Sequence, residues 1–157
     1  MSSKEEKVLI IMKPDCVARS LLGEIIHRFE RKGLHIIGMK MSQLGDVILE
    51  EHYAHKKDKP FFAGIKSYMK SLPMVLVALS GVNAVKVVRL LVGPTKGHDA
   101  QAGTIRGDFS LSTQSNIVHA SDSVDSGQIE IKRFFKEHEL FSYRKPEYEF
   151  LYSEDEV

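Results

Sequence analysis

Cysteine is nearly absent from this sequence, and its charges almost cancel. Cys16 is the single cysteine among 157 residues, which excludes an intrachain disulfide and a cysteine-based zinc site and fits a reducing compartment. The formal net charge is only +1 at pH 7, so no strong field draws the protein to nucleic acid or to an anionic membrane. We therefore expect no specific nucleic-acid partner.

Long apolar runs are also missing. Near the start of the chain, five apolar residues at 8–12 follow the charged segment "SSKEEK". This run is too short to cross a membrane, and the charged residues before it lack the layout of a secretory leader. The sequence predicts a cytoplasmic protein with no membrane partner.

Several common site motifs do not occur. The sequence has no Gly-Lys dipeptide for a phosphate-binding loop and no two glycines spaced for a dinucleotide fold. It also lacks an H-E-x-x-H zinc motif and a G-x-S-x-G nucleophile elbow. His52 and His55 lie one turn apart on an expected helix and could chelate a metal. No third ligand is obvious, so we interpret both as solvated and predict no metal ligand from the protein.

The sequence does contain alternating strand-like and helix-like segments, with the composition of one soluble domain over 1–157. Apolar runs predict strands at 8–12, 34–44, 74–80 and 116–120, and helical spacing predicts helices at 20–33, 45–59, 60–71, 83–93 and 123–135. We expect Ser20 and Asn83 to cap helices, Pro60 to lie in a first turn and Gly33 to end a helix. This order favours an α/β (α+β sandwich) fold, with a ferredoxin-like split β-α-β antiparallel sheet covered by helices.

One histidine, His119, lies where an expected strand ends and an expected helix begins. It belongs to the stretch "NIVHASD" at 116–122. A histidine in this place is either a core residue satisfied by hydrogen bonds or a reactive group directed into a site. The residues around it alone leave both interpretations open.

Residues suited to phosphate binding are scattered through the chain. Lys13 follows a buried strand, and Arg89 lies in an amphipathic helix. Thr95 and Arg106 lie in a long loop at 93–113, and loops of this length are usually functional or disordered. Taken alone, each fits an ordinary surface residue. They indicate a phosphate site only if the fold brings them together.

The motif around His119 resembles the active-site signature of nucleoside diphosphate kinases. Other motifs of that family follow in the same order: "KPD" at 13–15, "GEIIHRFERKG" at 23–33, "HY" at 52–53, "KPFF" at 59–62, "GPT" at 93–95 and "GTIRGDF" at 103–109. The resemblance extends over about residues 6–152. It implies transfer of the γ-phosphoryl group from a nucleoside triphosphate to a nucleoside diphosphate, by a ping-pong mechanism through a phosphohistidine. It also implies Mg²⁺, bound mainly through the nucleotide phosphates.

Imidazole suits this chemistry. In water its pKa is near 6.5, so a histidine can act as a neutral nucleophile near pH 7. A covalent intermediate lets donor and acceptor use one site in turn. The resemblance assigns the orientation of His119 to Glu130 and Ser121 and places Tyr53 close to it. Without the resemblance, Glu130 fits a solvent-facing helix residue.

The resemblance assigns nucleotide binding to Lys13, Phe61, Ile65, Arg89, Thr95, Arg106 and Asn116. Phosphoryl transfer is catalysed mainly by positioning and by stabilisation of negative charge, which the three cations supply. Lys13 and Asn116 are also expected to reach the sugar hydroxyls. Phe61 is expected to stack on the base, and low base specificity follows because every base has a π-face.

The resemblance further implies a homo-oligomer, expected to be a hexamer built from dimers. If the strand at 34–44 is an edge strand, pairing between two copies would bury Ile36 or Ile37. After Thr95 the family usually has Asn-Pro where this chain has Lys96-Gly97. We expect this glycine to leave the loop less rigid and the hexamer easier to dissociate.

Two other functions were considered. A catalytically idle nucleotide-binding oligomeric scaffold or regulator would keep the fold without the reaction, but the complete set of expected catalytic positions argues against it. A nucleic-acid-binding module of the same fold is disfavoured by the net charge and by the lack of interleaved aromatic and basic residues.

Overall fold

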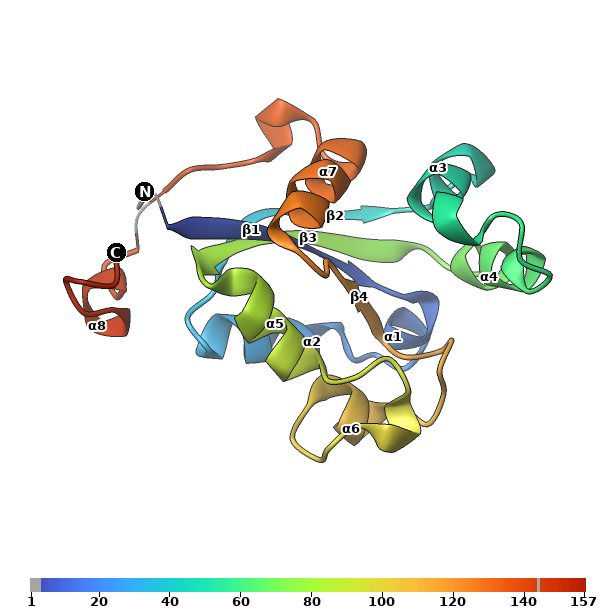
Figure 1. Ribbon diagram of the computed structural model, residues 1–157, viewed down its shortest axis with the longest axis horizontal. Helices are drawn as coiled ribbons and strands as arrows, with labels where there is room; N and C mark the ends of the chain where they lie inside the picture. Colours follow the sequence, from blue (N-terminus) through green and yellow to red (C-terminus); the bar gives the residue numbers. More distant parts are fainter. Residues whose placement is uncertain (1–3, 144) are drawn as a thin grey trace.

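The computed structural model describes residues 4–143 and 145–157 and is built on one antiparallel sheet (Figure 1). Its strands are β1 (Glu5–Met12), β2 (His35–Ser42), β3 (Met74–Val82) and β4 (Val118–Ala120), in the order β2-β3-β1-β4. Every neighbouring pair is antiparallel. This arrangement confirms the predicted ferredoxin-like fold.

Helices cover both faces of the sheet, which explains why residues 8–12 of β1 and most of β3 are apolar. On one face, Val8, Ile10 and Met12 pack with α2 (Leu22–Arg31) and α5 (Ala84–Val92). On the other face, Leu9 and Ile11 pack with α3 (Asp46–His52), α4 (Phe62–Met69) and α7 (Val124–Phe134). Figure 1 shows α2 and α5 on one side of the sheet and α7 on the other. The helices α1 (Pro14–Ala18), α6 (Ile105–Phe109) and α8 (Tyr148–Leu151) complete the set, with 3₁₀ turns at Ala54–Lys56, Gly97–Asp99 and Glu137–Glu139.

Several predicted helix starts were wrong. Ser20 and Asn83 have positive φ angles of 56° and 55°, and neither side chain caps the helix that follows. Each residue forms a sharp turn that directs the chain into the following helix, α2 or α5. Asparagine tolerates this conformation better than most residues. Pro60 precedes α4 by two positions. Pro14 opens α1, where a proline needs no hydrogen-bond donor.

The edge strand β2 was predicted correctly, but part of its edge is already covered. The backbone N–H of Phe141 donates to the carbonyl of Ile37 at 2.7 Å, and the Tyr143 hydroxyl donates to the carbonyl of Ile36 at 2.6 Å. Ile37 is buried in the single chain. Pairing of two copies therefore adds nothing to the burial of Ile37, whereas Ile36 is half-buried and its burial by pairing stays a prediction. Met39 and Met41, further along β2, are the side chains left exposed, at 54% and 59%.

The loop around Gly97 is tightly packed, which contradicts the expected flexibility. Gly97 is buried, and its N–H donates to the Ser112 carbonyl at 3.1 Å. A Cβ atom on Gly97 would overlap the backbone carbonyl and the hydroxyl of Ser110. A proline here would also remove the donor, so replacing Gly97 with the proline that the family usually has would not stabilise this loop.

We expect Gly97→Ala to lower the free energy of unfolding by roughly 1–3 kcal/mol, because an added methyl in a packed site forces backbone shifts. Urea denaturation of this variant and of wild type measures the difference. Gly64→Ala is the matched control, because a Cβ on Gly64 meets no atom within 4 Å. Equal stability of the Gly97→Ala variant and wild type would contradict the packing argument.

Candidate active site

His119 lies in β4, opposite Ile11 of the central strand β1. Because Ile11 faces the layer of α3, α4 and α7, its antiparallel partner His119 faces the same layer. Its side chain is 22% exposed, so one part of the ring is accessible from a cavity while the rest is buried against the protein. The edge position of the three-residue strand β4 leaves this end of the sheet open.

The imidazole of His119 is oriented by a chain of hydrogen bonds. Its Nε2 lies 3.0 Å from Glu130 Oε2, which also accepts from the Ser121 hydroxyl at 2.6 Å. The Ser121 oxygen accepts the Leu9 N–H at 3.0 Å, which ties the chain to β1. Burial alone would raise the pKa of Glu130, but its bonds to His119 and Ser121 and the nearby His52 lower it overall. A carboxylate at Nε2 places the proton there and leaves the lone pair on Nδ1, the atom able to act as a nucleophile.

The three predicted cations line one cavity of about 820 Å³, together with His119 and a fourth cation, Lys56. Lys13 follows β1, Arg89 lies on α5, and Arg106 lies on α6. Burial, followed by the charge of Arg106, lowers the pKa of Lys13 to about 8. Burial, followed by the charge of Arg89, lowers the pKa of Arg106 to about 10. Cations that depress each other's pKa form a site that an anion would stabilise.

Arg106 is held by backbone carbonyls. Its guanidinium donates to the carbonyls of Gly93, Asn116 and Val118 at 3.1, 3.1 and 2.7 Å. These bonds hold the long loop against β4, and because all three acceptors are uncharged carbonyls, they do not neutralise the charge of Arg106. Arg106 therefore serves both the structure of the loop and the electrostatics of the cavity.

Polar residues of the cavity wall are also linked to one another. Lys13 Nζ donates to Asn116 Oδ1 at 2.6 Å, and the Asn116 amide donates to the Thr95 carbonyl at 2.8 Å. Phe61, which is 53% exposed, and Ile65 line the same cavity. An exposed aromatic face next to bound polar groups can stack on a planar ring.

The structure brings ten of the eleven predicted site residues to this cavity: Lys13, Tyr53, Phe61, Ile65, Arg89, Thr95, Arg106, Asn116, His119 and Glu130. The eleventh, Ser121, is fully buried behind Glu130. Glu130 is not the solvent-facing residue that its helix alone suggested, because its side chain is only 13% exposed.

Other residues of the cavity were not predicted from the sequence. Thr113 and Gln114 lie on its wall, and the Gln114 carbonyl accepts from Lys13 at 3.2 Å. His52 was expected to be solvated, which was wrong: it is 7% exposed and its ring contacts His119. The sequence did carry a signal for His52, the "HY" motif at 52–53. The resemblance assigned its second residue, Tyr53, to the site but not its first.

The potential metal ligands near His119 are engaged in other contacts. Within the described ranges, one group of potential ligands, His52, His119 and Glu130, has its atoms within 4.8 Å of one another. Arg133 donates to Nδ1 of His52 at 3.2 Å, which places the remaining proton of a neutral ring on Nε2 and leaves no lone pair for a metal. Asp122 lines the cavity, but the Ser126 hydroxyl bonds to it and, despite partial desolvation, lowers its pKa.

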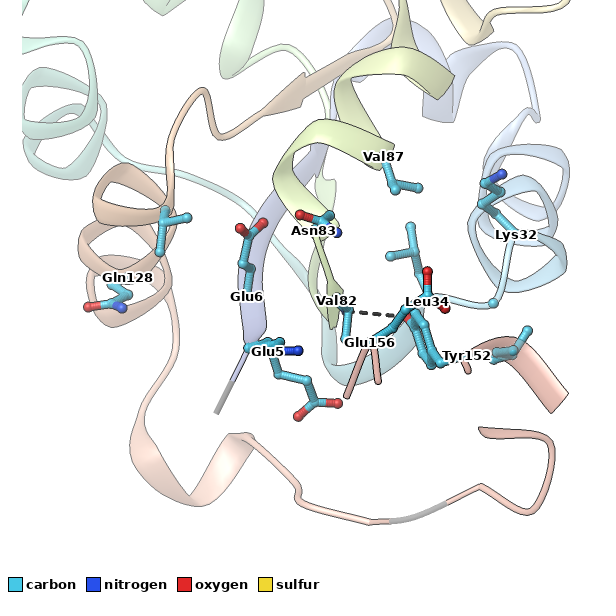
Figure 2. Close-up of a pocket in the computed structure, with 14 residues that line it drawn as sticks. Glu5, Glu6, Lys32, Leu34, Val82, Asn83, Val87, Gln128, Tyr152 and Glu156 are labelled. Carbon is cyan, nitrogen blue, oxygen red and sulfur yellow. Dashed lines mark hydrogen bonds between the residues drawn. The ribbon is translucent and has the colours of Figure 1, made fainter. Parts of the chain in front are cut away.

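A second cavity, of about 880 Å³, lies near the two ends of the described chain (Figure 2). Its wall includes Glu5, Glu6, Lys32 and Tyr152, and the Tyr152 hydroxyl accepts the Val82 N–H at 3.2 Å. Mixed charges and apolar side chains line it, and His119 lies elsewhere. We place the candidate active site at the cavity of His119, because a nucleophile, its orienting carboxylate and the cations meet there.

None of the helices in the parts of the chain that the structure describes has the length and apolar character needed to cross a membrane.

Comparisons with known proteins identify the family of this chain. The sequence model of the family described as "Nucleoside diphosphate kinase" matches residues 6–140. A nucleoside diphosphate kinase of Parabacteroides distasonis is 54% identical over 96% of this chain and 99% of its own length. Nucleoside diphosphate kinase A of Canis lupus familiaris is 45% identical, over 96% and 99%. A solved nucleoside diphosphate kinase of Halobacterium salinarum in complex with CDP superimposes with a TM-score of 0.92 at 37% identity, over 95% of this chain and 99% of that one.

Proposed function

This chain belongs to the nucleoside diphosphate kinase family, and we propose that the cavity around His119 is where it carries out the family's reaction. The enzyme transfers the γ-phosphoryl group of a nucleoside triphosphate to a nucleoside diphosphate through a phosphohistidine. One observation carries the assignment to this cavity: His119, with Nε2 held by Glu130, shares the cavity with Lys13, Arg89 and Arg106.

In the first half-reaction, Nδ1 of His119 attacks the γ-phosphorus. The N–P bond forms as the bond to the β-phosphate oxygen breaks, and the nucleoside diphosphate leaves with that electron pair. The proton on Nε2 stays in its hydrogen bond to Glu130, and the carboxylate stabilises the positive charge that the ring gains. In the second half-reaction, a terminal oxygen of another nucleoside diphosphate attacks phosphorus and the N–P bond breaks.

The cations stabilise the transferring group. Lys13, Arg89 and Arg106 neutralise negative charge on the phosphate oxygens, and the Thr95 hydroxyl donates a further hydrogen bond. The Tyr53 hydroxyl packs beside His119 and the phosphates. Arg106 needs no reorganisation at the moment of transfer, because three carbonyls already hold it.

The nucleoside occupies the outer end of the cavity. Phe61 stacks on the base and Ile65 borders it, while Lys13 and Asn116 bind the sugar hydroxyls. The 2.6 Å bond between Lys13 and Asn116 supports this pairing, since it holds both groups ready for one pair of hydroxyls.

Magnesium enters with the nucleotide. Apart from Asp122 and Glu130, the described lining of the cavity offers no carboxylate, and Glu130 is already bonded to His119 and Ser121. This lining fits an ion carried by phosphate oxygens and waters rather than by the protein. When bound, Mg²⁺ supplies charge neutralisation to the phosphates.

We also propose a cytoplasmic homo-oligomer, a hexamer built from dimers. The exposed Met39 and Met41 on β2 support an interface on this edge, beyond the segment that Phe141 and Tyr143 cover. Light scattering in native buffer tests the assembly, and a monomer would contradict it.

The decisive experiment for the proposed function is incubation with γ-labelled ATP and no acceptor. We expect a phosphoenzyme that is labile to acid and stable to base, and rapid release of the label as a triphosphate when GDP is added. An idle nucleotide-binding scaffold would bind ATP and remain unlabelled, which would overturn the proposal.

The charge of Lys13 gives the reaction an alkaline limit. Its pKa of about 8 in the free protein means that this charge is lost as the pH rises through that value. We expect kcat/KM, which reports groups of the free enzyme, to fall above about pH 8. In Lys13→Arg the alkaline limb should move to higher pH, because a guanidinium stays protonated. An unmoved limb in this variant would assign the titration to another group.

A further inference from the structure

His52 lies directly behind the nucleophilic histidine. It ends α3 and is 7% exposed. Its ring meets the edge of the His119 ring, with centroids 4.6 Å apart and planes at 82°. The rings of Tyr53 and Phe134 also pack against the His52 ring, with centroids 4.7 and 5.2 Å from it. His52 is therefore a packed wall of the site, and any tilt of its ring would move His119.

Arg133 of α7 holds the far side of the His52 ring. Its Nη1 lies 3.2 Å from His52 Nδ1, and its Nε donates to Glu51 Oε1 at 2.9 Å. The Arg133 side chain is 15% exposed, so it is fixed against the protein. A guanidinium can only donate, so Nδ1 of His52 must be unprotonated, and the neutral ring carries its proton on Nε2. Glu130 and Arg133 lie one helical turn apart on α7 and thus support the two neighbouring rings from one element.

The surroundings of His52 also keep it uncharged. His119 of β4, Glu130 and Arg133 of α7, and His55 of the 3₁₀ turn face it. Burial, followed by the charges of His119 and Arg133, lowers the pKa of His52 to about 3, while Glu130 acts in the opposite direction. An imidazolium at this place would lose its hydration and would face the guanidinium.

We propose that Arg133 is a positioning residue for phosphoryl transfer, acting through His52: its hydrogen bond to Nδ1 fixes the tautomer and tilt of the His52 ring, against which the His119 ring is held. This inference rests on the proposed function, because the ring it positions is the nucleophile of that reaction. Glu130 holds the His119 ring through its contact with Nε2, and the Arg133–His52 pair fixes the orientation of the His119 ring plane. Arg133 itself is absent from the cavity lining, so it acts without touching the nucleotide.

The test is the rate of phosphoenzyme formation from ATP, followed by rapid quench at pH 7.5, in wild type, Arg133→Gln, His52→Asn and the double variant. We expect Arg133→Gln to slow the step about three- to thirtyfold, the range for coupled neighbours, with the dissociation constant for ATP unchanged. In the double variant, where no His52 ring remains to be positioned, the added effect of Arg133→Gln should vanish.

Controls separate this role from general stability. Lys132→Gln removes a charge from an exposed neighbour on α7, and Glu51→Gln weakens the other bond of Arg133; both should phosphorylate like wild type. Arg133→Lys retains a donor and a charge and should recover part of the rate. If Arg133→Gln fails to fold, Arg133→Met, which keeps the aliphatic stem, takes its place.

Additive effects of Arg133→Gln and His52→Asn, or a rate for Arg133→Gln equal to that of wild type, would overturn the role of Arg133. Failure of the wild-type enzyme to form a phosphoenzyme would instead overturn the proposed function itself, so the two failures are distinguishable.

Discussion

His119→Gln is expected to lose phosphoenzyme formation and nucleotide exchange together, by about 10⁴-fold or more, the scale of removing a covalent nucleophile. The amide of glutamine can still bond to Glu130 and fill most of the ring's volume, but it cannot accept a phosphoryl group on nitrogen. The fold should be kept, since His119 is 22% exposed and lies in an edge strand. Labelling with γ-labelled ATP and a coupled exchange assay measure both losses.

The control for this substitution is His138→Gln, because His138 is an exposed histidine outside the cavity. It should keep full activity. A His119→Gln enzyme with more than trace turnover, at an unchanged melting temperature, would show that the phosphoryl group does not pass through this ring.

Removal of the cavity cations is expected to have the next largest effect. Lys13→Ala, Arg89→Ala and Arg106→Ala should each slow turnover roughly ten- to a thousandfold at saturating nucleotide, the range for losing one preorganised charge-stabilising donor. Steady-state kinetics with ATP and a diphosphate acceptor measure kcat for each variant. Lys86→Ala, which removes an exposed cation of α5 outside the cavity, should be close to wild type.

The three cation variants should differ in stability. Arg106→Ala removes a donor from the carbonyls of Gly93, Asn116 and Val118, of which Asn116 still accepts the Val118 N–H. A buried carbonyl left unsatisfied costs about 1–3 kcal/mol, so this variant should be less stable than wild type. Arg89 is exposed, so Arg89→Ala should leave the melting temperature unchanged. Near-wild-type kcat in all three variants would mean that these residues do not serve one phosphate site.

Local patterns in the sequence predicted most of the secondary structure. The apolar run of β1 and the helical spacing of α2 and α5 are properties of neighbouring residues, and burial follows from them whatever the rest of the chain does. Helix starts were predicted less well. Ser20 and Asn83 looked like caps, but each adopts a positive φ because the chain must turn sharply there to pack its helix on the sheet. That requirement comes from the sheet and not from the residue.

The sequence by itself determined which residue is the candidate nucleophile, because His119 stands in a recognisable motif at a strand end. Only the tertiary structure decided that Lys13, Arg89 and Arg106 share its cavity. They come from the ends of three separate elements, and the antiparallel register of β4 on β1 is a long-range property that no local pattern encodes. The same holds for His52 and Arg133, which are 81 residues apart in the chain. Each reads as a surface residue on its own helix, and the packing of α3 and α7 on one face of the sheet brings them together behind His119.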